Sequence, residues 1–230
     1  MIKSRIAIAG ALLAAAGVAS AGEFSVTPTI ASDYDWRGIS QTNDQLDGDF
    51  GAGPAFQLGL NYGFDNGFYV GAWGSNVDFG PGDPSVEVDL FAGYAGGDSE
   101  AGIGYDFGLN YYTYPSASSI NTIEAYAGIS HGPFSGKLWV TNDYFNSDES
   151  AVYVEGNVDY PLPSDFSLLA HVGYSFGKTF SQTDSEYVDY SVGVGYTVNK
   201  FDVALKYIDT DISGYTDNKV VLSVSTTLPW

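Results

Sequence analysis

The sequence predicts an all-β protein, an antiparallel up-and-down transmembrane β-barrel of about 12 strands. Three observations support this fold. Apolar and polar residues alternate with a period of two in many segments, and the connections between segments are alternately short and long. The composition is rich in Gly, Tyr and Phe and contains a single Met and no Cys. A chain without Cys has neither a disulfide framework nor a thiolate metal site.

The first 21 residues are typical of a secretory signal peptide. Lys3 and Arg5 precede an apolar run of 13 residues, and Ala19-Ser20-Ala21 matches an A-x-A cleavage site. A membrane anchor is the alternative, but a helix of that length reaches only about 20 Å, less than a hydrocarbon core of roughly 30 Å. We therefore expect residues 1–21 to be cleaved on export and residues 22–230 to form one barrel domain in the outer membrane of a Gram-negative bacterium.

The alternation of apolar and polar residues defines the strands in order. In the first segment Phe24 and Val26 lie on one face, and Ser25 and Thr27 lie on the other. The third segment is ambiguous, because Tyr69, Trp73 and Val77 compete with Phe68, Val70 and Ala72 for the apolar face, so its orientation stays open. The same period predicts strands at 24–38, 52–64, 68–77, 85–96, 100–112, 121–130, 134–143, 151–160, 166–176, 187–198, 201–210 and 219–230.

The connections predict how these strands are joined. Those after even-numbered strands are short, for example 65–67 and 199–200, whereas those after odd-numbered strands are longer, for example 39–51 and 177–186. In an up-and-down barrel, all connections at one end follow odd strands and all at the other end follow even strands. This regularity favours the barrel.

The surroundings of the apolar face need a separate argument, because a secreted soluble sandwich or barrel shows the same period with that face inside. Segments of ten or more residues suit a tilted membrane crossing, whereas soluble strands most often have about five or six. Aromatic residues lie near both ends of the apolar face, and we expect Trp36 in the girdle at the long-loop end. The last segment alternates up to Leu228 and Trp230, which resembles the signal read by the barrel assembly machinery. Outer-membrane lipid is therefore the expected surrounding.

The opposite face of the strands is acidic, so the predicted lumen is acidic as well. Its basic residues are Arg37, Lys137 and Lys206, and Arg37 is close enough in sequence to Asp33 and Asp35 to form a local ion pair. His171 also faces inward. The inward carboxylates are Asp33, Asp35, Glu87, Asp89, Asp106, Glu124, Glu155, Asp159, Asp189 and Asp202.

This pattern favours a porin-like channel for the passive passage of small solutes, with a preference for cations. A plugged structural or binding barrel, whose charges pair across the lumen, is the alternative. An outer-membrane enzyme of the lipase or protease type is a further one, but no serine adjoins His171 on its own strand, so no catalytic residue is predicted. A net charge of -20 excludes nucleic acid as a partner. No cofactor is predicted, and no metal site either, because the acidic loops lack the spacing of a calcium loop.

Two stretches of the sequence resemble conserved blocks of a known family. They are Ser32-Asp33-Tyr34-Asp35-Trp36-Arg37-Gly38-Ile39-Ser40-Gln41-Thr42 and Gly71-Ala72-Trp73-Gly74-Ser75-Asn76-Val77. Both resemble the TorF-type porins of bacteria, the Gcw_chp family, although Phe is more usual where Trp36 stands. The resemblance implies an outer-membrane barrel that forms a pore. It supplies neither a substrate nor catalytic residues.

Overall fold

The computed structural model describes residues 22–42, 53–80, 83–182, 185–212 and 218–229. The predicted signal peptide, residues 1–21, and Trp230 of the predicted assembly signal lie outside these ranges. Helical structure within them is limited to η2 (Ser118–Ile120), η3 (Tyr144–Asn146) and α1 (Lys178–Ser181). None of the described helices is long and apolar enough to span a membrane.

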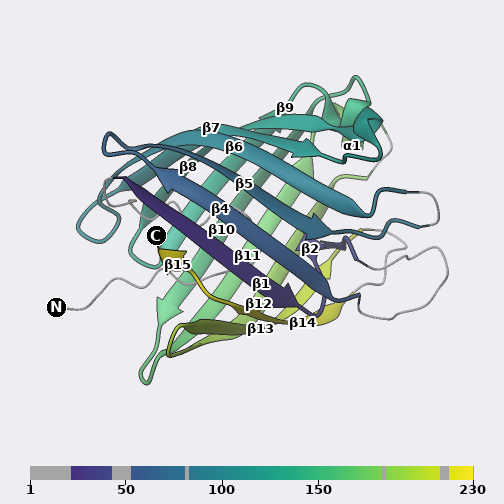
Figure 1. Ribbon diagram of the computed structural model, residues 1–230. Helices are drawn as coiled ribbons and strands as arrows, with labels where there is room; N and C mark the ends of the chain where they lie inside the picture. Colours follow the sequence, from purple (N-terminus) through teal and green to yellow (C-terminus); the bar gives the residue numbers. More distant parts are fainter. Residues whose placement is uncertain (1–21, 43–52, 81–82, 183–184, 213–217, 230) are drawn as a thin grey trace.

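The strands form one closed antiparallel barrel (Figure 1). Each long strand pairs with the next along the chain, and β14 and β15 both pair with β1, which closes the barrel. Because β14 and β15 share one register against β1, they are two parts of a single last strand, and the predicted count of 12 is confirmed. The barrel strands are β1 (Glu23–Ala31), β4 (Ala55–Gly63), β5 (Phe68–Asn76), β6 (Val86–Gly97), β7 (Gly104–Thr113), β8 (Thr122–His131), β9 (Phe134–Thr141), β10 (Ala151–Pro161), β11 (Phe166–Phe176), β12 (Tyr187–Val198), β13 (Phe201–Thr210), β14 (Lys219–Ser225) and β15 (Leu228–Pro229).

The interruption between β14 and β15 has a local cause in the sequence. The register places Thr226 opposite Pro28 of β1, and the Thr226 amide donates to the Pro28 carbonyl at 3.3 Å. Proline has no N–H to return a second bond, so the ladder is weakened at this position. Pairing resumes with Val26 and Leu228.

The outer surface of the barrel is apolar. Large hydrophobic side chains such as Phe56, Ile129 and Leu205 are exposed on it. At the end with the short turns, aromatic rings pack in neighbouring pairs, such as Phe166 with Tyr196, whose centroids are 4.6 Å apart. A smaller set of exposed tyrosines, Tyr111, Tyr174, Tyr190 and Tyr207, lies at the end with the long loops.

The structure resolves the orientation of β5 that the sequence left open. Tyr69 is buried and Trp73 half-buried inside the barrel, whereas Phe68 and Val70 are exposed outside. Both faces of this strand are apolar because its inner face packs against another part of the chain, through the ring of Tyr34 on Trp73. The usual contrast between lipid-facing and lumen-facing residues is therefore lost here.

The largest correction concerns the first strand. The sequence predicts a strand at 24–38, but β1 ends at Ala31, and the chain then turns into the barrel, where it forms the short strands β2 (Asp35–Trp36) and β3 (Ile39–Ser40) (Figure 1). Residues 32–42 are called the inner hairpin below. The placement of Trp36 in an outer girdle is therefore wrong, because its ring packs on Tyr112 and Tyr144 inside the barrel.

Candidate functional site in the barrel lumen

The inner hairpin owes its shape to a two-residue turn. Arg37 and Gly38 have φ angles of 51° and 82°, and the flanking residues Trp36 and Ile39 are paired. Positive φ at both central residues is typical of a type I′ turn, which matches the twist of a hairpin. Glycine is needed at position 38 for space as well, because a Cβ there would lie 2.7 Å from the Cβ of Asp189. The turn therefore rests directly against the wall formed by β12.

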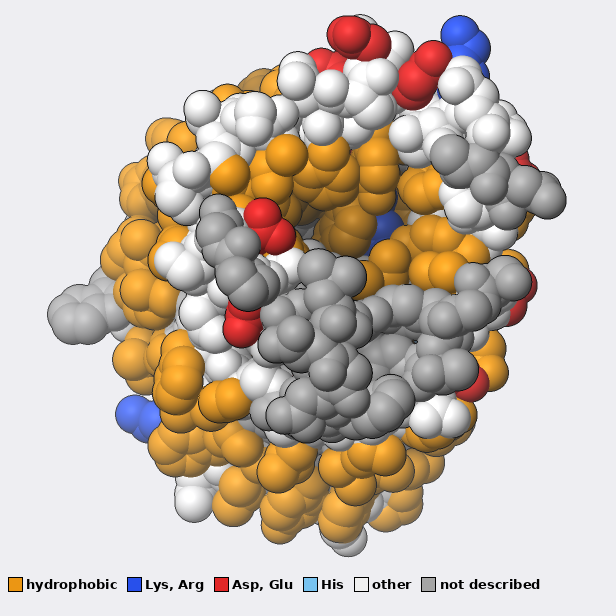
Figure 2. All heavy atoms as spheres, turned by 90° about the vertical axis from the view of Figure 1, so that its right-hand side faces the viewer, with side chains coloured by type: hydrophobic (Ala, Val, Ile, Leu, Met, Phe, Trp, Pro, Cys, Tyr) orange, Lys and Arg blue, Asp and Glu red, His pale blue; other side chains and the backbone are white. Residues whose placement is uncertain are grey.

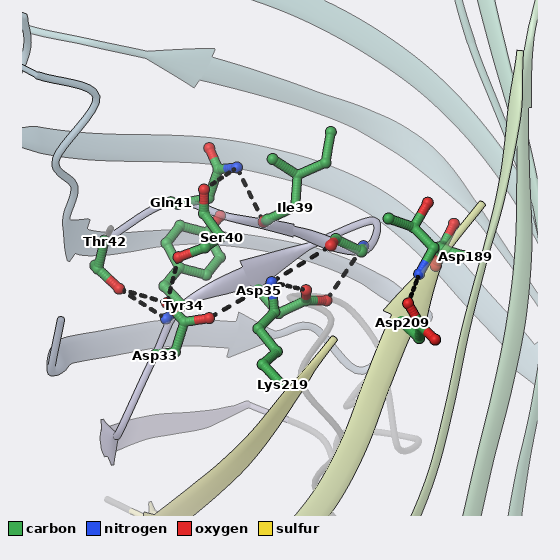
Figure 3. A network of polar contacts seen from close by, with 12 residues as sticks. Asp33, Tyr34, Asp35, Ile39, Ser40, Gln41, Thr42, Asp189, Asp209 and Lys219 are labelled. Carbon is green, nitrogen blue, oxygen red and sulfur yellow. Dashed lines mark hydrogen bonds and ion pairs between the residues drawn. The ribbon is translucent and has the colours of Figure 1, made fainter. Parts of the chain in front are cut away.

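Hydrogen bonds within the inner hairpin hold it together (Figure 3). Asp33 Oδ1 accepts hydrogen bonds from Ser40 Oγ at 2.5 Å and from Thr42 Oγ1 at 2.8 Å. Tyr34 donates its hydroxyl proton to Glu87 Oε1 of β6 at 3.1 Å. Asp33 thus joins the two arms of the hairpin, and Tyr34 fixes the hairpin to the barrel wall.

Arg37 attaches the tip of the inner hairpin to the opposite side of the lumen. Its two terminal nitrogens donate to Glu124 of β8, at 3.1 Å to Oε1 and 2.6 Å to Oε2. The guanidinium carbon lies 4.4 Å from the centre of the Trp36 ring and 4.3 Å from that of Tyr153 on β10. Burial opposes the charged form, but Glu124 more than offsets it and holds the pKa of Arg37 above its ordinary value. Arg37 is therefore charged at every physiological pH.

Lys219 of β14 binds the other side of the inner hairpin. Its Nζ lies 3.0 Å from Asp35 Oδ1 and 3.6 Å from Asp33 Oδ2, and it donates to the Gly38 carbonyl at 3.3 Å. Burial raises the pKa of Asp35, and the charge of Lys219 acts against this rise. The pairing of Arg37 with Asp33 and Asp35 that sequence proximity suggested is wrong, because the turn points Arg37 away towards Glu124.

A strongly buried acidic region lies beside the inner hairpin. Glu87 and Asp89 follow one another on the inner face of β6 and are at most 1% exposed. Glu87 accepts from Tyr34 and from Tyr114, and Asp89 accepts from Asn110 at 3.1 Å. The partners described for these two groups are hydroxyl and amide groups and each other, and neither group forms an ion pair of the kind that Glu124 forms with Arg37.

His171 of β11 joins three strands of the wall. Its Nε2 lies 2.8 Å from Asp189 Oδ1 and 3.0 Å from the Tyr153 hydroxyl, and its Nδ1 lies 2.7 Å from Asn157 Oδ1. Asn157 also donates its amide to Glu155 Oε2 at 2.9 Å, which fixes the amide oxygen towards the imidazole. Both nitrogens of His171 thus face oxygen atoms, and none of these partners is a serine.

The half of the lumen near the short turns is less acidic. Lys137 of β9 pairs with Asp106 Oδ2 of β7 at 2.9 Å, and Asp106 also accepts from Tyr69 at 2.5 Å. Lys206, near the middle of β13, interacts electrostatically with Asp35 of the inner hairpin and with Asp159 of β10. The predicted lumen residues therefore divide into a long-loop half, where the inner hairpin lies, and a short-turn half with the pair of Lys137 and Asp106.

The charge balance of the lumen follows from these positions. All ten carboxylates expected inside lie within the barrel, but Asp33 and Asp35 belong to the inner hairpin rather than to a strand. Lys219 joins Arg37, Lys137 and Lys206, so among the described residues these ten carboxyl groups face four basic residues, a formal excess of six negative charges. Figure 2 shows the long-loop end, where the surface is hollowed between hydrophobic walls and carries acidic groups on its rim. No group of three or more His, Cys, Asp or Glu in the described ranges is arranged to hold a metal ion.

Residues 15–228 match a family described as a bacterial protein of unknown function, Gcw_chp. The chain belongs to the Gcw_chp family. No curated protein matches the sequence. The family description names no activity, so it assigns no function to the lumen residues.

Solved structures of porins share the fold of this Gcw_chp chain. The KdgM porin has a TM-score of 0.54 at 12% sequence identity, over 89% of this chain and 97% of that one. The KdgM porin in complex with disordered oligogalacturonate gives 0.51 at 12% identity, over 90% and 98%. The NanC porin gives 0.51 at 12%, over 89% and 97%. At this identity, the likeness concerns the architecture of the barrel.

Sequence reasoning missed the main structural feature of this Gcw_chp lumen, the inner hairpin, together with Tyr112, Tyr153 and Lys219 as its contacts. One signal was present. Arg37-Gly38 between Trp36 and Ile39 is a pair of residues between two apolar ones that suits a two-residue turn. The apolar residues Tyr34 and Trp36 outweighed this turn signal, because an inner hairpin that packs on the barrel wall shows the same period of two as a strand that faces outward.

Proposed function

We propose that this protein is a porin-like outer-membrane channel through which small solutes pass passively, and that it prefers cations. The observation that carries the proposal is the excess of six negative charges inside a barrel whose outer surface is apolar. A low-dielectric wall concentrates the field of such charges on solutes that enter the lumen. The porin architecture of the structural neighbours supports a channel, whereas the preference for cations rests on the lumen charge alone.

The charge of the lumen bears on the class of solute. The KdgM porin has been solved with oligogalacturonate, which is a polyanion. The acidic lumen of the present chain disfavours a solute of that charge, because its carboxyl groups outnumber its basic residues. Small cations and neutral molecules are the solutes that we expect to pass.

The reversal potential in a planar bilayer under a KCl gradient tests the proposal. We expect a potential of the sign that marks cation preference, and it should shrink at high salt as the Debye length falls from about 10 Å at 0.1 M to about 3 Å at 1 M. The double substitution Glu87→Gln with Asp89→Asn should weaken the preference. Anion preference in the unaltered protein would contradict the proposal.

A matched control exists in the short turn after β6. Glu100→Gln with Asp98→Asn removes the same two residue types, also two positions apart, from exposed sites outside the lumen. Asp98 accepts hydrogen bonds from the backbone amides of Glu100 and Ala101, and Asn at this position keeps a side-chain oxygen that can accept them. This control should leave the reversal potential close to that of the unaltered protein. An equal loss in both double variants would mean that overall charge, and not the lumen, sets the selectivity.

A structural or binding barrel with a closed lumen is the second candidate, and the inner hairpin is the observation that favours it. It is attached on one side through Lys219 and on the other through Arg37, so it crosses the interior of the barrel. Heat-modifiable migration shows whether the protein is folded. Folded protein that carries no current would support the closed barrel over the channel.

A further inference from the structure

The pocket around the Arg37 guanidinium resembles a ligand site more than a simple ion pair. A carboxylate contacts both terminal nitrogens, the rings of Trp36 and Tyr153 lie within 4.4 Å and 4.3 Å of the guanidinium carbon, and Tyr112 donates to Glu124 Oε2 at 3.1 Å. Planar, doubly donating cations suit this arrangement, because the guanidinium fork matches a carboxylate and stacks on aromatic faces.

Most of the pocket belongs to the barrel wall and does not depend on the inner hairpin. Glu124 is on β8, Tyr112 on β7 and Tyr153 on β10, and all three side chains are buried. Only Trp36 and Arg37 come from the hairpin. The guanidinium group is therefore held by the wall in the way that a solute would be.

The backbone of the inner hairpin is bent to deliver this group. Arg37 has a φ of 51°, in the left-handed region that residues with a Cβ seldom adopt. The turn places the guanidinium at Glu124 while Lys219 holds Asp35 behind it. A disfavoured backbone conformation at the residue that fills the pocket is consistent with a tethered ligand.

We propose that Glu124, Tyr112 and Tyr153 form a binding site for guanidinium-type organic cations on the lumen wall, and that Arg37 occupies it as a tethered ligand. Solutes with a guanidinium group then compete with Arg37. A tethered group acts at an effective concentration of millimolar or more, so free solute binds the unaltered protein weakly. This inference rests on the proposed function for its role in permeation, whereas binding itself does not require conduction.

The test measures binding of ethylguanidinium, which copies the end of the arginine side chain, to folded full-length protein by isothermal titration calorimetry. Arg37→Ala should bind ethylguanidinium at least about tenfold more tightly than the unaltered protein, because the competitor is gone. Adding Glu124→Gln to Arg37→Ala should remove that gain. Ethylammonium, which has the charge without the fork, should bind Arg37→Ala at least about threefold more weakly than ethylguanidinium.

Two further variants keep the result interpretable. Lys137→Ala also removes one basic residue from the lumen. Lys137 pairs with Asp106 at 2.9 Å and lies over the rings of Tyr126 and Trp139, away from Glu124, so this variant leaves Arg37 on Glu124 and should not gain affinity for ethylguanidinium. Arg37→Lys retains the charge and serves if Arg37→Ala does not fold. It should bind ethylguanidinium at least about threefold more tightly than the unaltered protein, because an ammonium fills only part of the pocket.

Equal binding of ethylguanidinium to the unaltered protein and to a folded Arg37 variant would overturn the inference. So would an equal gain in Lys137→Ala, which would point to lumen charge alone. Failure of the channel proposal is a separate result. If folded Arg37→Ala binds ethylguanidinium in solution but carries no current in a bilayer, the binding site is supported and the porin function is contradicted.

Discussion

Val172→Arg tests whether the apolar outer face meets hydrocarbon. Val172 lies on β11, which runs from Phe166 to Phe176, and its side chain is 53% exposed on the outside of the barrel. At about 3.3 Å per residue and a tilt of roughly 40°, this strand rises about 25 Å, the height of the apolar band of an outer-membrane barrel. Val172 is one residue from the middle of the strand, so its depth is within about 2.5 Å of the midplane.

The expected cost follows from that depth. Arginine on the lipid face destabilises a barrel by about 2–4 kcal/mol at the midplane and by about 0–1 kcal/mol near the interface. Val198, the last residue of β12 and 37% exposed, is the matched control, since it lies about 14 Å from the middle of its strand by the same geometry. Both substitutions exchange the same side chains, so the difference of about 1–4 kcal/mol measures the effect of depth.

The assay is reversible denaturant unfolding of protein folded into phospholipid vesicles, followed by tryptophan fluorescence. Val172→Arg should lower the free energy of unfolding by about 2–4 kcal/mol, and Val198→Arg by at most about 1 kcal/mol. An equal cost at both positions, or none at either, would refute the argument that this face is embedded in lipid. The apolar surface would then need another partner.

Three further predictions concern the inner hairpin, assembly and topology. Lys219→Ala should lower the free energy of unfolding by about 1.5–3 kcal/mol, because Asp35 loses its charged hydrogen-bond donor. A denaturation curve that matches the unaltered protein would contradict this. Trp230→Ser should reduce the folded protein in the outer membrane, as measured by heat-modifiable migration and fractionation, and unchanged amounts would remove the assembly argument. In a chain without cysteine, Ser147→Cys in the loop after β9 should react with an impermeant maleimide on intact cells, whereas Asn66→Cys in the turn after β4 should react only after lysis. The opposite labelling would invert the topology.

The sequence by itself determined the architecture of the barrel. A period of two shows which residues share a face of each strand, and the alternation of short turns such as 199–200 with long loops determines the up-and-down order. Both are local properties of the chain. They were sufficient to predict 12 antiparallel strands and to place carboxylates such as Glu87 and Asp189 inside the barrel.

Only the tertiary structure decided what fills the lumen. Tyr34 and Trp36 continue the period of the first strand, yet they lie inside, because a hairpin that packs on an inner wall and a strand that faces lipid both show an apolar residue at every second position. The pairing of Arg37 with Glu124 joins residues 87 positions apart. Such a contact depends on how β8 is brought around to face the inner hairpin, and closure of the barrel, rather than any local pattern, sets that geometry.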